Sequence, residues 1–135
     1  MNSKQRIGKY SPTEEKINII THASGLVFGV VALILLIMRA LKYGDTLHVI
    51  TFIVFGLSMI LLYTASTLYH SAKDMSLRAK FQVFDHTSIY ILIAGTYTPF
   101  TLIVLQGTLG WVLFGIIWSL ALGGVILKLF FTGRF

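Results

Sequence analysis

The stretch that decides the fold is HTSIYILIAGTYTPFTLIVLQGTLGWVLFGIIWSLALGGVIL, from His86 to Leu127, which contains no Asp, Glu, Lys or Arg. An α-helix needs roughly 20 apolar residues to cross the hydrocarbon core of a bilayer. This stretch is therefore long enough for two membrane-spanning helices. The polar segment Gln106-Gly107-Thr108 near its middle is the natural turn between them.

Two further spans precede this stretch. The segment from Ile17 to Met38 also lacks Asp, Glu, Lys and Arg, and it is longer than the apolar core of a signal peptide. Just before it, Ser11-Pro12-Thr13-Glu14 has the pattern of a helix start, with a capping serine and an early proline. We predict a cytoplasmic segment 1–16 and a transmembrane domain 17–135, with spans at about 17–38, 46–69, 84–105 and 109–131. The polar stretch 71–84 is interpreted as a connection.

The composition agrees with a membrane protein. Of the 135 residues, 56% are hydrophobic and 12% are charged, whereas soluble domains carry about 25% charged residues. The absence of cysteine excludes a disulfide framework and a thiolate metal site within this sequence. The basic residues behind the net charge of +6 lie between apolar runs, so we expect contact with anionic membrane lipids and not with nucleic acid. The predicted fold class is an all-α, polytopic membrane protein.

The distribution of basic residues predicts the orientation. Lys and Arg are frequent in the N-terminal segment, in the polar stretch 71–84 and in the C-terminal tail, whereas the turn at Gln106 is uncharged. Arg39 and Lys42 in the first loop weakly oppose this trend. By the positive-inside rule, the sum favours a multi-pass protein of the cell membrane with a cytoplasmic N-terminus.

With this topology, polar residues from three spans gather at the cytoplasmic side. Ser66 and His70 are four residues apart, so they share one face of the second helix. The group comprises Glu15, Asn18, His22, Ser66, His70, Asp85, His86 and Ser88. Histidine is a common zinc ligand, and a nearby carboxylate can orient it or accept a proton from water. No compact ligand motif is present, and the pattern alone favours interhelical hydrogen bonding over a metal site.

Two other features concern helix packing. Gly25 and Gly29 are spaced as in a close-packing face of the first span. Pro99, preceded by Thr96 and Thr98, lies inside the third span. It is expected to disturb that helix, with threonine hydroxyls satisfying the freed carbonyl groups.

At these positions the chain resembles the hemolysin III family, which belongs with the progestin and adipoQ receptors in a superfamily that includes alkaline ceramidases. The matching pieces occur in family order over most of the chain. They are Glu15-x-x-Asn18-x-x-Thr21-His22-x-x-Gly25, Ser66-x-x-x-His70, Asp85-His86-Thr87-Ser88 and Ala94-Gly95-Thr96-Tyr97-Thr98-Pro99-Phe100.

The resemblance implies a seven-helix membrane fold with a zinc site near the cytoplasmic side. It implies that His70 is a zinc ligand, that Ser66 is the serine of the second helix, and that Asp85 is the carboxylate close to the zinc-bound water. The family's other two zinc ligands come from an HxxxH motif on the last helix, which this sequence lacks. Either the sequence is a fragment that ends after the fourth of seven helices, which we favour, or it is a four-helix protein without the complete zinc site. The resemblance assigns no ligand role to His22.

Three functions are compatible with these observations. The first is a zinc-dependent membrane hydrolase that cleaves an amide or ester bond in a lipid, with Asp85 as general base. The second is a pore-forming, cytolytic protein, as the family name suggests. It has little support, because no charged stripe or alternating strand pattern lines a pore. The third is a receptor-like regulatory protein in which the polar residues are structural.

Overall fold

The computed structural model describes residues 10–131. It contains four long helices and one short π-helical segment: α1 (Pro12–Tyr43), α2 (Thr46–Ser71), α3 (Met75–Pro99), η2 (Phe100–Leu105) and α4 (Gly107–Phe131). Four helical segments are long and apolar enough to cross a membrane, with α3 and η2 counted as one. The all-α class with four spans is thus confirmed, whereas the total of seven helices stays a prediction. Residues 1–9 of the predicted cytoplasmic segment, and Arg134, lie outside the described residues.

Side-chain caps fix where the first two helices begin. The Ser11 hydroxyl accepts from the Glu14 backbone N–H at 3.3 Å, while the Glu14 carboxylate accepts from the Ser11 N–H at 2.7 Å. This reciprocal pair confirms the predicted helix start. At α2, Asp45 accepts from the His48 backbone N–H at 3.0 Å, and its hydrogen bond to the His48 side chain lowers the pKa of Asp45.

Helix α3 begins earlier than the sequence pattern suggested. We interpreted the polar stretch 71–84 as a connection, but α3 starts at Met75. The Asp74 carboxylate accepts from the Leu77 backbone N–H at 2.9 Å and so caps the helix. Polarity was therefore the wrong criterion here, because a polar segment can be helical wherever a cap is present. The early start places Arg78, Gln82 and Asp85 at helical spacing.

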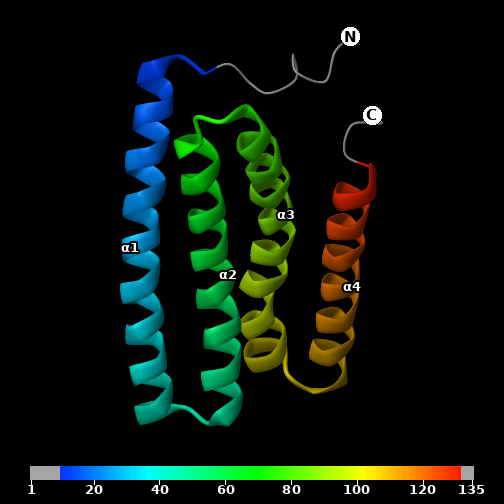
Figure 1. Cartoon of the computed structure of the whole chain (residues 1–135). Coiled ribbons are helices and arrows are strands. Elements are labelled where there is room, and N and C mark those ends of the chain that lie inside the picture. Colours follow the sequence, from blue (N-terminus) through cyan, green and yellow to red (C-terminus); the bar gives the residue numbers. More distant parts are fainter. Residues whose placement is uncertain (1–9, 132–135) are drawn as a thin grey trace.

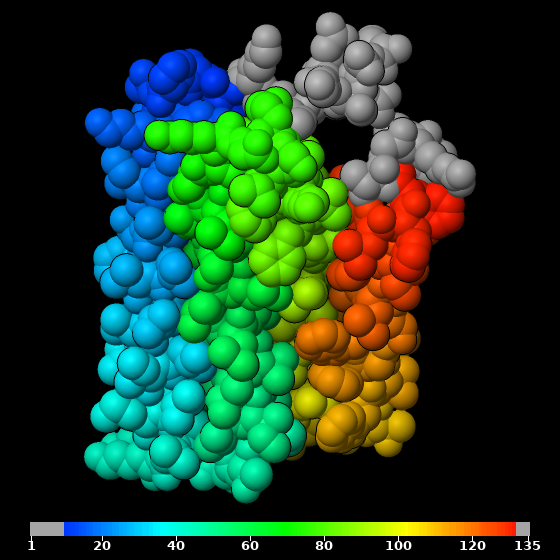
Figure 2. Space-filling view, viewed as in Figure 1, coloured from blue at the N-terminus to red at the C-terminus, as the bar shows by residue number. Residues whose placement is uncertain are grey.

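The helices form an open row in the order α1, α2, α3, α4 (Figure 1). Each long helix packs against its neighbours in the chain, and within the described residues α1 makes no packing contact with α4. Large apolar side chains stay exposed on the outer helices, for example Phe28 at 72% and Phe130 at 76%. Figure 2 shows α1 in blue and cyan and α4 in orange and red at the two edges of the row. Such surfaces suit contact with lipid or with further helices.

The third and fourth spans are joined as the sequence predicted. Directly after Pro99 the winding changes from α to π, as expected for a proline that breaks the regular hydrogen-bond pattern. The Thr98 hydroxyl donates to the Ala94 carbonyl at 2.8 Å and accepts from the Trp118 indole N–H at 3.0 Å. Gln106 then turns the chain with a φ of 50°. The predicted turn at Gln106-Gly107 is confirmed.

Small residues allow the closest helix contacts. A Cβ atom at Gly25 would lie 2.5 Å from the Tyr63 ring, and Gly29 is buried against Met59 on the same helix α2. The predicted close-packing face of α1 is therefore confirmed. The tightest contact to backbone involves Gly110 of α4, where a Cβ atom would collide with the Thr101 carbonyl oxygen of η2.

We expect Gly110→Val to lower the free energy of unfolding by about 1–3 kcal/mol, the usual cost of overpacking a tight contact. The backbone carbonyl of Thr101 cannot rotate away as a flexible side chain could. Gly115→Val is the matched control, because a Cβ atom there meets nothing within 4 Å. Denaturant titration in detergent micelles measures both variants. Equal stabilities would contradict this packing.

Candidate functional site

The sequence-predicted polar residues lie at one end of the helix row. The first turns of α1, the last turns of α2 and the first turns of α3 meet there, because α2 runs antiparallel to both neighbours (Figure 1). We call five of these residues the polar cluster: Glu15, His22, Ser66, His70 and Arg78. Hydrogen bonds or ring contacts connect each of them to another member.

Glu15 is the centre of the polar cluster. One carboxylate oxygen accepts a hydrogen bond from Nδ1 of His70 on α2, with the atoms 2.7 Å apart. The other oxygen pairs with the guanidinium of Arg78 on α3. The side chains of Glu15, His70 and Arg78 are only 17%, 7% and 11% exposed. One carboxylate thus joins all three helices in a largely buried environment.

Aromatic rings surround this ion pair. The Arg78 guanidinium lies over the Tyr69 ring, 4.9 Å from its centroid, in cation–π geometry. The Tyr69 ring centroid lies 4.7 Å from that of His70. Tyr10 contacts the His70 ring edge-on at 5.3 Å. The His70 ring is therefore held by its carboxylate partner and by two aromatic neighbours.

A second pair lies beside the first. Nδ1 of His22 on α1 and the Ser66 hydroxyl of α2 are 2.5 Å apart, which joins these helices by a short hydrogen bond. The rings of His22 and His70 meet edge-on with their centroids 5.5 Å apart. Ser66 and His70 are 5% and 8% exposed. The structure thus brings the two predicted α2 residues together with His22.

Asp85 lies next to the polar cluster and is half-buried on α3. Its carboxylate is within electrostatic range of His22, and among residues 10–131 it accepts no side-chain hydrogen bond. His86 follows it in the chain and interacts electrostatically with Lys128 of α4. The Ser88 hydroxyl donates to the Asp85 carbonyl at 2.6 Å and so stays within its own helix. Within residues 10–131, the Asp85 carboxylate therefore keeps free hydrogen-bonding capacity.

The polar cluster contains one histidine arranged like a metal ligand, but it does not form a complete metal site among the described residues. Ligand histidines often bond one ring nitrogen to a carboxylate and bind metal through the other. His70 has this arrangement, with Nδ1 bonded to Glu15 and Nε2 left over. Within the described chain, no three His, Cys, Asp or Glu side chains are grouped closely enough to hold a metal ion. The zinc prediction therefore stays a prediction.

Arg78 is the residue that sequence reasoning missed. Its basic neighbours Lys73 and Lys80 suggested only a role in membrane orientation. A usable signal was present, because Arg78, Gln82 and Asp85 recur at intervals of four and three residues, as on one face of a helix. The helix had been placed too late in the sequence for this face to be recognised.

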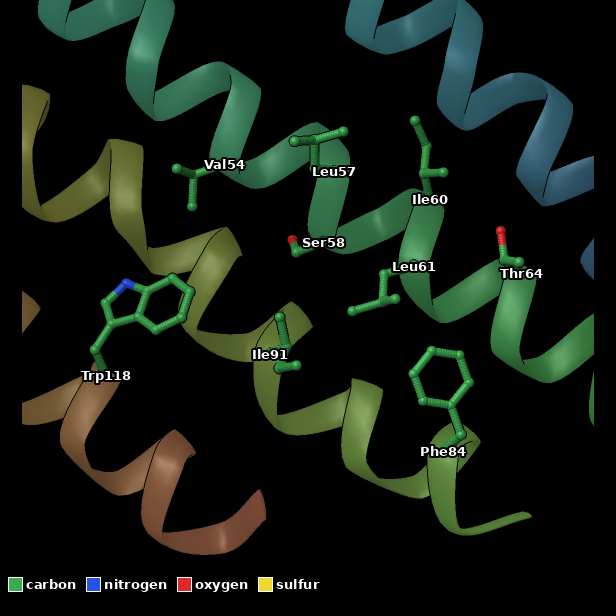
Figure 3. Close-up of a pocket in the computed structure, with 9 residues that line it drawn as sticks. All are labelled: Val54, Leu57, Ser58, Ile60, Leu61, Thr64, Phe84, Ile91 and Trp118. Carbon is green, nitrogen blue, oxygen red and sulfur yellow. The ribbon is translucent and has the colours of Figure 1, made fainter. Parts of the chain in front are cut away.

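An apolar pocket of about 530 Å³ lies among α2, α3 and α4 (Figure 3). Its lining side chains come from α2, α3 and α4, and Trp118 lies at the α4 side of the pocket. Phe84, which lines it from α3, directly precedes Asp85. Neither Asp85 nor any member of the polar cluster is among the residues that line this pocket.

Comparison with known proteins supplies a family. A family model described as Haemolysin-III related matches residues 10–134. The chain is 52% identical to Hemolysin-3 of Bacillus cereus over 122 residues, covering 90% of this chain and 56% of that protein. It is 49% identical to a Hemolysin-3 homolog of Bacillus subtilis, with coverages of 90% and 57%.

A more distant relative is the human Monocyte to macrophage differentiation factor. It is 32% identical over 126 residues, which cover 88% of this chain and 52% of that protein. The chain thus spans about half the length of the curated relatives it matches. No solved structure matches the chain.

Proposed function

The chain belongs to the haemolysin-III-related family, and from that premise we propose that the complete gene product is a zinc-dependent hydrolase of the cell membrane. Its substrate class is a lipid with an amide or ester bond. The chain is an integral membrane protein with several apolar spans. We further propose that the N-terminus and the polar cluster lie on the cytoplasmic side, in agreement with the distribution of basic residues.

The observation that carries this proposal is the buried hydrogen bond between Glu15 and His70. A carboxylate that accepts from one imidazole nitrogen fixes the tautomer and the direction of the other. Histidines that bind a metal commonly have such a carboxylate partner. His70 is thus the proposed zinc ligand of this chain, and Glu15 positions it.

Two further residues complete the proposed chemistry. Asp85 is the general base that accepts a proton from the attacking water, because its carboxylate has free acceptor capacity beside the polar cluster. Ser66 keeps His22 in place through their short hydrogen bond and presents a hydroxyl near the reacting bond. When bound, zinc supplies Lewis acidity that lowers the pKa of a water molecule towards neutrality.

The apolar pocket supports a lipid substrate. Its walls are almost entirely hydrocarbon, and one of its lining residues, Phe84, precedes Asp85 in α3. A lipid chain would contact Leu61 of α2 and Ile91 of α3, which both line the pocket (Figure 3). Apolar pockets with a few polar groups at one end are typical of sites for such ligands.

We expect His70→Ala to abolish stoichiometric zinc binding in the complete gene product, together with hydrolysis of lipid amides and esters. His48→Ala is the matched control, because His48 lies at the opposite end of α2, next to the Asp45 cap. Elemental analysis of purified protein gives zinc content, and fluorescent ceramide and ester-lipid analogues report hydrolysis. A wild-type protein without zinc, or unchanged zinc content in His70→Ala, would overturn the proposal.

A pore-forming function is the second possibility, and the name of the Bacillus cereus relative suggests it. Within residues 10–131 the charged side chains lie towards the ends of the helices, so none forms a stripe through the middle of a span. This distribution favours the hydrolase. A receptor-like protein would show altered signalling in Asp85→Ala and no lipid hydrolysis in the wild type. Dye leakage from vesicles with inserted protein distinguishes the pore from both other functions.

A further inference from the structure

We propose that the outer surface of the polar cluster binds the headgroup of an anionic phospholipid. The structure has a groove of about 780 Å³ between the first turns of α1 and the α2–α3 connection. Lys16 and Lys73 line it from these two elements. Both lysines are exposed, and within residues 10–131 neither pairs with a carboxylate. His70, the proposed zinc ligand, also lines the groove, so the lipid site adjoins the proposed zinc site, and this lipid is a bound partner and not the hydrolysed substrate.

The net positive charge of the groove favours an anionic ligand. Its lining includes three cationic side chains, Lys16, Lys73 and Arg78, against the single carboxylate of Glu15, which leaves a net charge of +2 with neutral histidine. The Glu15 carboxylate is already paired with Arg78 and His70. It therefore offers little repulsion to an incoming phosphate, while both lysine amines remain available.

The apolar part of the groove selects a lipid over a soluble anion. Ile19 and Ile20 of α1 and Met75 of α3 line it together with the lysines. Ile20 and Met75 are 56% and 51% exposed, so apolar surface and unpaired amines lie side by side at the end of a membrane-spanning helix. A phospholipid places phosphate and acyl chains in the same relation, whereas inorganic phosphate satisfies only the amines.

The test uses the complete gene product and two probes, dioleoyl phosphatidylglycerol and dioleoyl phosphatidylcholine, mixed in equal amounts. Native mass spectrometry measures which lipid the protein retains. We expect the wild type to prefer phosphatidylglycerol. From the attraction of one surface lysine to anionic lipid, the preference should fall by about fivefold for Lys73→Gln and about 25-fold for Lys16→Gln/Lys73→Gln. Arginine at both positions should preserve it.

A charge-matched control separates a site from general attraction. Arg39→Gln/Lys42→Gln removes two positive charges at the other end of α1, and we expect it to change the preference less than the groove variant does. Equal losses in the two double variants, or displacement of bound lipid by excess inorganic phosphate, would overturn the proposal. Zinc content and hydrolysis are separate measurements, so failure of this site and failure of the proposed enzyme are distinguishable.

A second measurement locates the lipid. The 135 residues contain no cysteine, so once any cysteine elsewhere in the complete gene product is replaced, Met75→Cys gives a single position in the groove for a fluorescent label. Brominated phosphatidylglycerol should quench this label more strongly than brominated phosphatidylcholine. A label at Leu109→Cys, at the other end of the helix row, should be quenched equally by both lipids. Equal quenching at Met75 would place the anionic lipid elsewhere and overturn the assignment to this groove.

Discussion

Replacing Glu15 by alanine is expected to lower the free energy of unfolding by about 3 kcal/mol, because it leaves the Arg78 guanidinium without its carboxylate in a largely buried position. This is the low end of the range for a broken buried pair, since the Arg78 side chain keeps 11% of its surface exposed. The same change removes the hydrogen-bond partner of His70. It therefore loosens the contacts of α1 with both α2 and α3.

Glu14→Ala is the matched control on the same helix. The Glu14 side chain is fully exposed and contacts only the Ser11 cap, so we expect a much smaller loss of stability. A double variant, Glu15→Ala/Arg78→Met, should be more stable than Glu15→Ala, because no unpaired charge remains. Denaturant titration in micelles measures all four proteins. If Glu15→Ala and Glu14→Ala have equal free energies of unfolding, the buried ion pair contributes nothing to the stability of the protein.

The spans could be predicted from sequence because hydrophobicity alone determines them. Every apolar run long enough to cross a bilayer is helical in the structure, and the capping pattern at Ser11 and the turn at Gln106 are where the sequence placed them. The beginning of α3 could not be found in this way. Its first turns are polar, and only the cap by Asp74 shows that they are helical.

The polar cluster was predictable as a gathering of residues, but its bonding was not. Antiparallel spans of similar length bring Glu15, His70 and Asp85 to one end of the helix row, independently of how their side chains are bonded. Which atoms pair depends on the rotation of each helix about its axis, and the polar residues alone do not determine that rotation. The pairing of Glu15 with both His70 and Arg78 therefore emerged only from the packed helices.

Asp85→Asn is expected to reduce turnover of the lipid substrate by about 10²–10⁴-fold, the range for loss of a general base, and to leave zinc content unchanged. Asparagine has nearly the same shape as aspartate but cannot accept the proton of the attacking water. Because the Asp85 carboxylate accepts no side-chain hydrogen bond within residues 10–131, the substitution should hardly affect packing. The fall should appear in kcat more than in KM, since the lipid chain contacts the apolar pocket.

Asp45→Asn is the matched control for this prediction, because Asp45 is an exposed cap at the opposite end of α2 and asparagine caps helices as well. It should retain wild-type turnover. Asp85→Glu should keep part of the activity, because the longer side chain still offers a carboxylate but displaces it. If Asp85→Asn bound zinc and hydrolysed lipid as fast as the wild type, the proton would have to be accepted by another group. His22 interacts electrostatically with Asp85 and would then be the residue to replace next.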